Sequence, residues 1–130
     1  MNYYLDSFKG TLFRQTQFAV FEQFIHEADA KGEPLTADTL DDVYGQLNQH
    51  YYGDSVEPGG DIALEWSRIP HFYYNFYVYQ YATGFAAATA LANKVVHGTD
   101  ADREAYLGFL KAGSSDYPTE IMKHAGVDMT

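Results

Sequence analysis

The stretch of the chain richest in side chains that could do chemistry runs from Ile69 to Gly84, IPHFYYNFYVYQYATG. It has an imidazole at His71 and seven aromatic residues between positions 72 and 81. A tyrosine ring is apolar, but its phenol needs a hydrogen-bond partner when buried, so this density is typical of a half-solvated surface that faces a ligand. Phenols ordinarily titrate near pH 10, so they keep their proton at neutral pH and can donate to a developing oxyanion.

The same stretch predicts a helix that begins at about Pro70, because proline has a preset φ and no amide hydrogen to leave unpaired in the first helical turn. On such a helix one face would carry positions i, i+3, i+7 and i+10, which are His71, Tyr74, Val78 and Tyr81. Two interpretations stay open. The face either binds a ligand or packs against neighbouring helices. Packing is the usual role of aromatic residues at helical spacing.

Other candidate sites are weaker. His26 and Glu27 begin a helical zinc motif, but its second histidine would stand at position 30, which is Ala30. Glu120 and His124 have the i, i+4 spacing of two metal ligands, although such a pair on a surface helix is more often a solvated contact. The absence of cysteine removes thiolate ligands, thiol nucleophiles and disulfides. The sequence therefore predicts no metal site built by this chain.

Composition limits the partners. A chain of 130 residues makes one domain at most, or a piece of a larger one. Eighteen acidic residues against eight basic ones give a net charge of −10, which repels both nucleic-acid phosphates and anionic lipid. We therefore expect no nucleic-acid or membrane partner. No apolar run reaches membrane-spanning length and the opening residues lack a signal-peptide pattern, so a cytoplasmic location is expected.

The elements that must position the aromatic segment are all predicted to be helical, about five in number, in one helical unit over 1–130. Apolar residues at helical spacing predict a long first helix over 1–31. Thr36 is the expected N-cap of a second helix that ends at Gly53, and a turn-rich acidic surface connection follows over 53–61. A short helical segment with Trp66 as its anchor comes next.

The helix from Pro70 is predicted to be central and to run through Gly84 as far as 97. Glycine inside a helix costs about 1 kcal/mol relative to alanine, so Gly84 is expected to allow close packing or the approach of a ligand. Thr99 and Asp102 resemble a capping box at the start of the next helix. A final short helix is expected over 118–124.

Four stretches resemble the C-terminal catalytic-domain region of the oligoendopeptidase F family, the bacterial relatives of thimet oligopeptidase. They are NYYLDSFKGTLFRQTQFAVFE, LNQHYYGDSVE, IALEWSRIPHFYYNFYVYQYATGFAAA and AYLGFLKAGSSDYPTEIMKHAGVDMT, which together span nearly the whole chain. The resemblance implies a mostly helical, cytosolic zinc metallopeptidase that hydrolyses internal bonds of short peptides. In this family a His-Glu-x-x-His helix and a later glutamate bind zinc, and a His and Tyr segment downstream stabilises the tetrahedral intermediate.

By position, the resemblance implies catalytic roles for His71, Tyr74 and Tyr81. It implies substrate-binding roles for Tyr77, Tyr79 and Gly84. Sequence does not decide which two phenols face the scissile carbonyl, and we choose Tyr74 and Tyr81 for their seven-residue separation on the face of His71. The zinc-binding helix has no counterpart here, so the chain is expected to start after it and to stop before the family's last helix. Zinc is thus expected in the full-length enzyme but not in this fragment, which alone should be inactive.

A non-catalytic helical binding module, whose tyrosine face holds a partner helix, is the alternative. That alternative predicts a closed core with polar surroundings. A peptidase fragment instead predicts broad apolar surfaces left uncovered by missing parts, and homo-oligomers could then form through the exposed aromatic faces.

Overall fold

The computed structural model describes residues 2–55 and 60–129, and the described residues form helices and turns without any strand. The helical elements are, in order, α1 (Asn2–Phe8), η1 (Lys9–Phe13), α2 (Arg14–Ala30), α3 (Ala37–Tyr52), α4 (Tyr79–His97), α5 (Asp100–Ala112) and α6 (Pro118–His124). Short 3-10 turns separate α3 from α4: η2 (Gly53–Ser55), η3 (Gly60–Ile62), η4 (Glu65–Arg68) and η5 (Pro70–Tyr73). The all-α prediction is confirmed.

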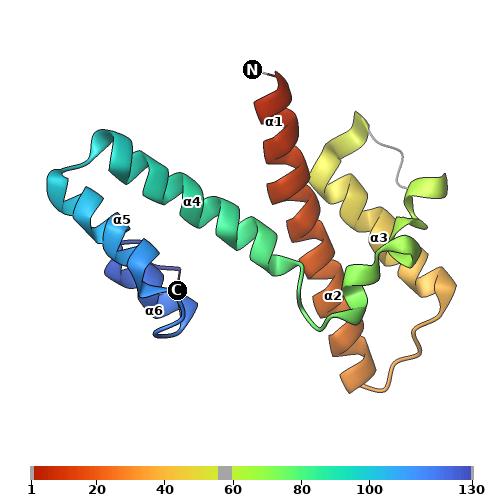
Figure 1. Cartoon of the computed structure of the whole chain (residues 1–130). Coiled ribbons are helices and arrows are strands. Elements are labelled where there is room, and N and C mark those ends of the chain that lie inside the picture. Colours follow the sequence, from red (N-terminus) through yellow and green to blue (C-terminus); the bar gives the residue numbers. More distant parts are fainter. Residues whose placement is uncertain (1, 56–59, 130) are drawn as a thin grey trace. The chain divides into compact units, whose positions relative to one another are not determined.

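The first helix is continuous, because α1, the π-helical segment η1 and α2 follow one another without a break (Figure 1). This confirms the long helix predicted over 1–31. The helix ends at Ala30, and Gly32 follows its C-cap with a φ of +74°, a left-handed conformation that glycine adopts without strain. Only the α2 part has buried side chains, so this half of the helix is the one that supports a core.

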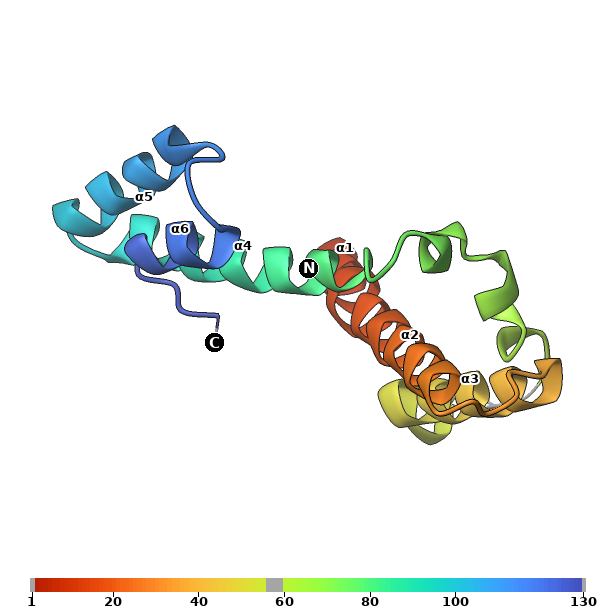
Figure 2. The same cartoon turned by 90° about the horizontal axis from the view of Figure 1, so that it is seen from below.

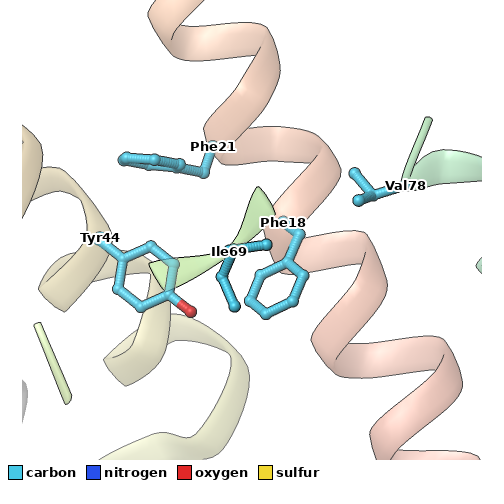
Figure 3. Packing of buried hydrophobic residues seen from close by; sticks show 5 residues of the cluster. All are labelled: Phe18, Phe21, Tyr44, Ile69 and Val78. Carbon is cyan, nitrogen blue, oxygen red and sulfur yellow. The ribbon is translucent and has the colours of Figure 1, made fainter. Parts of the chain in front are cut away.

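α3 begins as predicted, since the Thr36 hydroxyl accepts a hydrogen bond from the amide of Thr39 at 3.2 Å. The helix packs on α2 through a first core cluster, which Figure 3 shows from close by. Its five buried members are Phe18, Phe21, Tyr44, Ile69 and Val78. The Phe21 ring meets the Tyr44 ring edge-on, with centroids 5.2 Å apart. Aromatic packing thus joins α2 to α3 and to the segment that follows.

A buried glutamate ties the same elements together by polar contacts. Glu65 of η4 accepts hydrogen bonds from Arg14 of α2, from Arg68 at 2.7 Å and from the Tyr44 hydroxyl at 2.8 Å. Burial, reinforced by the hydrogen bond to Glu65, raises the pKa of Tyr44 above its ordinary range. The predicted anchor Trp66 is confirmed, because its indole N–H donates to Asp41 of α3 at 2.7 Å.

The helix predicted from Pro70 is wrong in its first turns. Pro70 does occupy a first helical position, but of a single 3-10 turn, and α4 begins only at Tyr79. Between them Asn75 and Phe76 have φ of +46° and +62°, both in the left-handed region. A right-handed helix cannot pass through two such residues. The gap in the helix is therefore a tight left-handed turn.

The chain divides into two compact units, residues 1–82 and 83–130, and each has a core. In the second unit α5 and α6 lie against α4 (Figure 2), around buried Ala87, Leu91, Ala125 and Val127. The predicted capping box at the start of α5 is confirmed by reciprocal bonds between Thr99 and Asp102. The expectation of a single helical unit over 1–130 stays a prediction.

The acidic connection and the last helix were also predicted from the sequence. The acidic connection predicted over 53–61 lies partly outside the described residues, which omit 56–59. The final helix predicted over 118–124 is confirmed as α6. Within the described part of the chain, the helices are too short or too polar to cross a membrane.

Candidate functional site

An imidazole and three phenols gather around the left-handed turn. The His71 ring stacks on the Tyr77 ring, with centroids 5.5 Å apart and planes 18° from parallel. It meets the rings of Tyr74 and Tyr81 edge-on at 6.4 and 6.2 Å. Tyr77 in turn contacts both other tyrosines. We call His71, Tyr74, Tyr77 and Tyr81 the His-Tyr cluster.

The structure brings together His71, Tyr74 and Tyr81, which the sequence placed on one helix face, but by a different geometry and with Tyr77 among them. Val78, expected on the same face as His71, is completely buried in the first core. The turn, and not a shared helix face, brings Tyr77 onto His71. Spacing on an ideal helix therefore grouped Tyr74 and Tyr81 with His71, but it left out Tyr77 and misplaced Val78.

The cluster faces solvent in this chain. Tyr74, Tyr77 and Tyr81 keep 63%, 40% and 38% of their surface exposed, whereas His71 is half-buried beneath them. These phenols therefore do not form a closed core within the described chain. Their partial exposure is what we expect of a surface that binds a ligand.

One hydrogen bond orders the phenols. The Tyr81 hydroxyl donates to the Tyr77 hydroxyl at 3.3 Å. This bond, together with burial and the nearby Tyr77 charge, raises the pKa of Tyr81 above its ordinary value near 10. A hydroxyl that accepts one bond still has its own proton to donate. Tyr77 thus keeps a proton that it can donate to a peptide, and the Tyr81 proton becomes available when a substrate oxygen competes for this exposed bond.

Apolar anchors on both sides hold the turn on the first core. Phe72 precedes it and packs against Phe18 and Phe21, with ring centroids 5.8 and 5.4 Å apart. Val78 follows the turn and is buried. Apolar side chains thus point inward just before and just after the residues that display the phenols, so the cluster rests on a packed support.

The side chain that sequence reasoning missed is Glu22 of α2. It is 1% exposed, and its Oε1 accepts a hydrogen bond from the backbone amide of Phe76 at 2.7 Å. The sequence feature that could have identified Glu22 is its position as a charged residue within the apolar run FAVFEQFI. The signal for the turn was Asn75, since asparagine is among the few residues that tolerate a left-handed conformation.

The remaining predicted site residues are also located. Tyr79 is the first residue of α4 and is 53% exposed. Gly84 lines an apolar hollow of about 410 Å³ in the second unit, next to Ala87 and Ala88 and facing Tyr106 and Phe109 of α5. Apart from its chain neighbours and the backbone of its own helix, no described atom lies within 4 Å of where a Gly84 Cβ would stand. Close packing within the described part of the chain therefore does not explain this glycine.

Metal-ligating side chains do not cluster among the described residues. No group of three or more His, Asp or Glu residues there is placed to hold a metal ion. His26 instead lies against Phe76, with ring centroids 4.3 Å apart. The described part of the chain therefore does not fit a zinc ion by itself.

Large apolar side chains are exposed over much of both units. The most exposed include Tyr3, Tyr73, Val96, Leu110 and Tyr117. A closed module with polar surroundings, as the interaction-module hypothesis predicts, would not leave so many uncovered. The surface is closer to that expected of a part of a larger helical domain.

The sequence and the helical fold of this chain match a class of peptidases. The model of peptidase family M3 matches residues 2–130. The chain therefore belongs to peptidase family M3. Its relatives include "Oligoendopeptidase F, plasmid" of Lactococcus lactis subsp. cremoris, 64% identical over 129 residues, and "Oligopeptidase PepF" of Bacillus subtilis, 54% identical over 130 residues. The resemblance to oligoendopeptidase F is confirmed.

Solved structures agree. The crystal structure of oligoendopeptidase-F from Enterococcus faecium superposes on 98% of this chain with a TM-score of 0.94 and 62% identity. The chain covers 25% of that protein. It spans 22% of the Lactococcus relative and 19% of the Bacillus one, although 99% and 100% of its own residues are matched. The chain thus corresponds to about a fifth to a quarter of its relatives.

Proposed function

We propose that this chain is the part of a zinc-dependent oligoendopeptidase that binds the substrate peptide and stabilises the oxyanion formed when an internal peptide bond is attacked. The observation that carries the proposal is the exposed His-Tyr cluster on a packed support, in a chain of peptidase family M3. Short peptides are the proposed substrates, and a cytoplasmic location is proposed from the same family relationship. Zinc dependence is proposed for the longer enzyme, and the role of this chain is derived without the metal.

The proposed division of work follows from the chemistry of the side chains. His71, Tyr74 and Tyr81 are the residues assigned to the oxyanion, while Tyr77, Tyr79 and Gly84 are assigned to the peptide. Neutral phenols donate hydrogen bonds without taking part in proton transfer, so they can stabilise negative charge as it develops on the carbonyl oxygen. The stack of His71 on Tyr77 keeps the imidazole beside these donors.

The chain alone is proposed to be inactive, because the described residues supply donors but no group of metal ligands. A test therefore needs a complete active site. One suitable protein is a hybrid in which these 130 residues replace the matching quarter of the Enterococcus faecium enzyme, which is 62% identical here. The hybrid with the native chain should cleave short peptides.

In that hybrid, His71→Ala and Tyr81→Phe should each lower kcat by about 100- to 1000-fold, the usual cost of losing one oxyanion donor. Tyr117→Phe is the matched control, because it removes an exposed phenol that lies in the second unit at the N-cap of α6. The proposal fails if the hybrid cleaves peptides and the cluster variants are as active as the control. It also fails if the native hybrid folds and has no activity.

A further inference from the structure

A buried hydrogen bond connects α2 to the turn that carries the phenols, and its role as inferred below rests on the proposed function. Glu22 lies on α2, 54 residues before Phe76 in the sequence, yet its Oε1 accepts the Phe76 amide hydrogen at 2.7 Å. The side chain is almost fully buried. A buried acceptor on a fixed helix gives this hydrogen bond a defined position that an exposed loop contact would lack.

The turn that donates this bond has an unfavourable backbone conformation. Asn75 tolerates a left-handed conformation, but for a bulky residue such as Phe76 a φ of +62° is an uncommon and strained state. Such states persist when the surroundings hold them. Here two side chains from α2 do so: Glu22 bonds the Phe76 backbone and His26 lies against its ring at 4.3 Å. Both are on one face of α2, four residues apart.

The left-handed turn determines where the phenols lie. Tyr74 and Tyr77 flank the left-handed pair directly, and Tyr77 carries the stack with His71 and accepts the bond from Tyr81. If residues 75 and 76 became right-handed, helical spacing would carry Tyr77 away from the His71 ring. The placement of the cluster therefore depends on a conformation that the local sequence does not favour by itself.

We propose that Glu22 is a positioning residue for the oxyanion site: through the Phe76 amide it holds the left-handed turn that places Tyr74 and Tyr77 beside His71. It touches neither substrate nor reacting atoms in this role. The alternative is that Glu22 only stabilises the first unit, in which case its loss would affect folding and leave the turnover of the folded enzyme unchanged.

Two variants of Glu22 separate these roles in the hybrid enzyme. Glu22→Gln keeps the length and an acceptor oxygen, whereas Glu22→Met keeps the length and removes the oxygen acceptor. The Gln variant should retain most of the native kcat. The Met variant should lose about 10- to 100-fold in kcat, the scale expected when catalytic groups are misplaced by about 1 Å. Circular dichroism at the assay temperature selects conditions in which every variant is folded.

Should Glu22→Met not fold, Glu22→Asp carries the same test, because an oxygen one methylene shorter cannot keep the 2.7 Å bond. Equal kcat in the native and acceptor-lacking variants would overturn the proposal. So would a Gln variant as impaired as the Met variant, since the amide oxygen should rescue the contact.

A second measurement does not depend on peptidase activity. Amide hydrogen exchange in the 130-residue chain should show the Phe76 amide protected in the native and Gln forms and at least about tenfold faster in the Met form. A Phe76 amide that exchanges equally fast in all three forms would refute the role of Glu22. An inactive native hybrid with a protected, Glu22-dependent Phe76 amide would refute the proposed function alone.

Discussion

At the scale of single residues, the chemistry of the cluster rests on a hydroxyl pair. The bond from Tyr81 to Tyr77 is exposed and long at 3.3 Å, so a substrate oxygen can compete with it. The same bond raises the pKa of Tyr81. An ordered donor that remains protonated is what an oxyanion site requires.

Tyr77→Phe should therefore lower the pKa of Tyr81 toward 10, because it removes both the hydrogen bond and the neighbouring phenolate charge that raise it. NMR titration of carbon-13-labelled tyrosine rings measures this directly in the chain. Tyr117→Phe should leave the Tyr81 titration unchanged. A Tyr81 pKa that is the same with and without Tyr77 would show that the two hydroxyls are not bonded.

The buried contact between Tyr44 and Glu65 gives a second prediction at the residue scale. Tyr44→Phe leaves the Glu65 Oε2 without its buried donor, and an unsatisfied buried group costs about 1–3 kcal/mol. Trp66 is the sole tryptophan of the sequence and packs against the same core, so its fluorescence reports urea unfolding of this unit. An unchanged unfolding midpoint would contradict the contact.

At the scale of elements, the helices were predictable and the turn was not. Periodic apolar residues and clear caps such as Thr36 and Thr99 specified the helices from local sequence alone. The region from Pro70 to Val78 depends on a residue 54 positions away, because the Phe76 amide bonds Glu22. Local propensity contains no information about that contact, and so it predicted a continued helix.

The N-terminus of α5 gives a prediction that depends on pH. Hydrogen bonds from the Thr99 hydroxyl and amide, together with Lys94, lower the pKa of Asp102 from 3.8 to about 2. A lowered folded-state pKa stabilises the fold above the unfolded value and loses that effect as pH falls through the folded value. The cap should thus weaken between about pH 4 and pH 2.

Amide exchange at the first turn of α5, followed against pH, measures this loss. Asp102→Asn should abolish the pH dependence in that window, because the side chain can no longer be protonated. The same pH dependence in the native and Asn forms would assign the effect to another group.

At the scale of the whole molecule, motifs in the sequence were enough to recognise the family. The chain matches only about a fifth to a quarter of its relatives' length, and its surface has many exposed apolar residues. Exposed apolar residues such as Tyr3, Val96 and Leu110 lie on several elements. Apolar surface of this extent favours association. Sequence periodicity indicated which helix faces are apolar, whereas the exposure of these residues is a property of the folded chain.

We therefore expect the isolated chain to self-associate. Sedimentation velocity should show a weight-average mass that rises with concentration above the 14.7 kDa of one chain. The hybrid enzyme, in which these faces regain neighbours, should not show that rise. A chain that stays monomeric over the whole concentration range would contradict the expectation and favour the closed interaction module.

In the proposed function, the phenols of the His-Tyr cluster hold the oxyanion of the reacting peptide. The most direct measurement compares, in the hybrid, the affinity of a phosphinic peptide that mimics the tetrahedral intermediate with that of a product peptide. Tyr81→Phe should weaken the binding of the phosphinic peptide by about the factor lost in kcat/KM. It should leave the affinity for the product peptide nearly unchanged, because only the mimic of the intermediate carries the charge. An equal loss for both peptides, or a loss for neither, would contradict this role of the phenols.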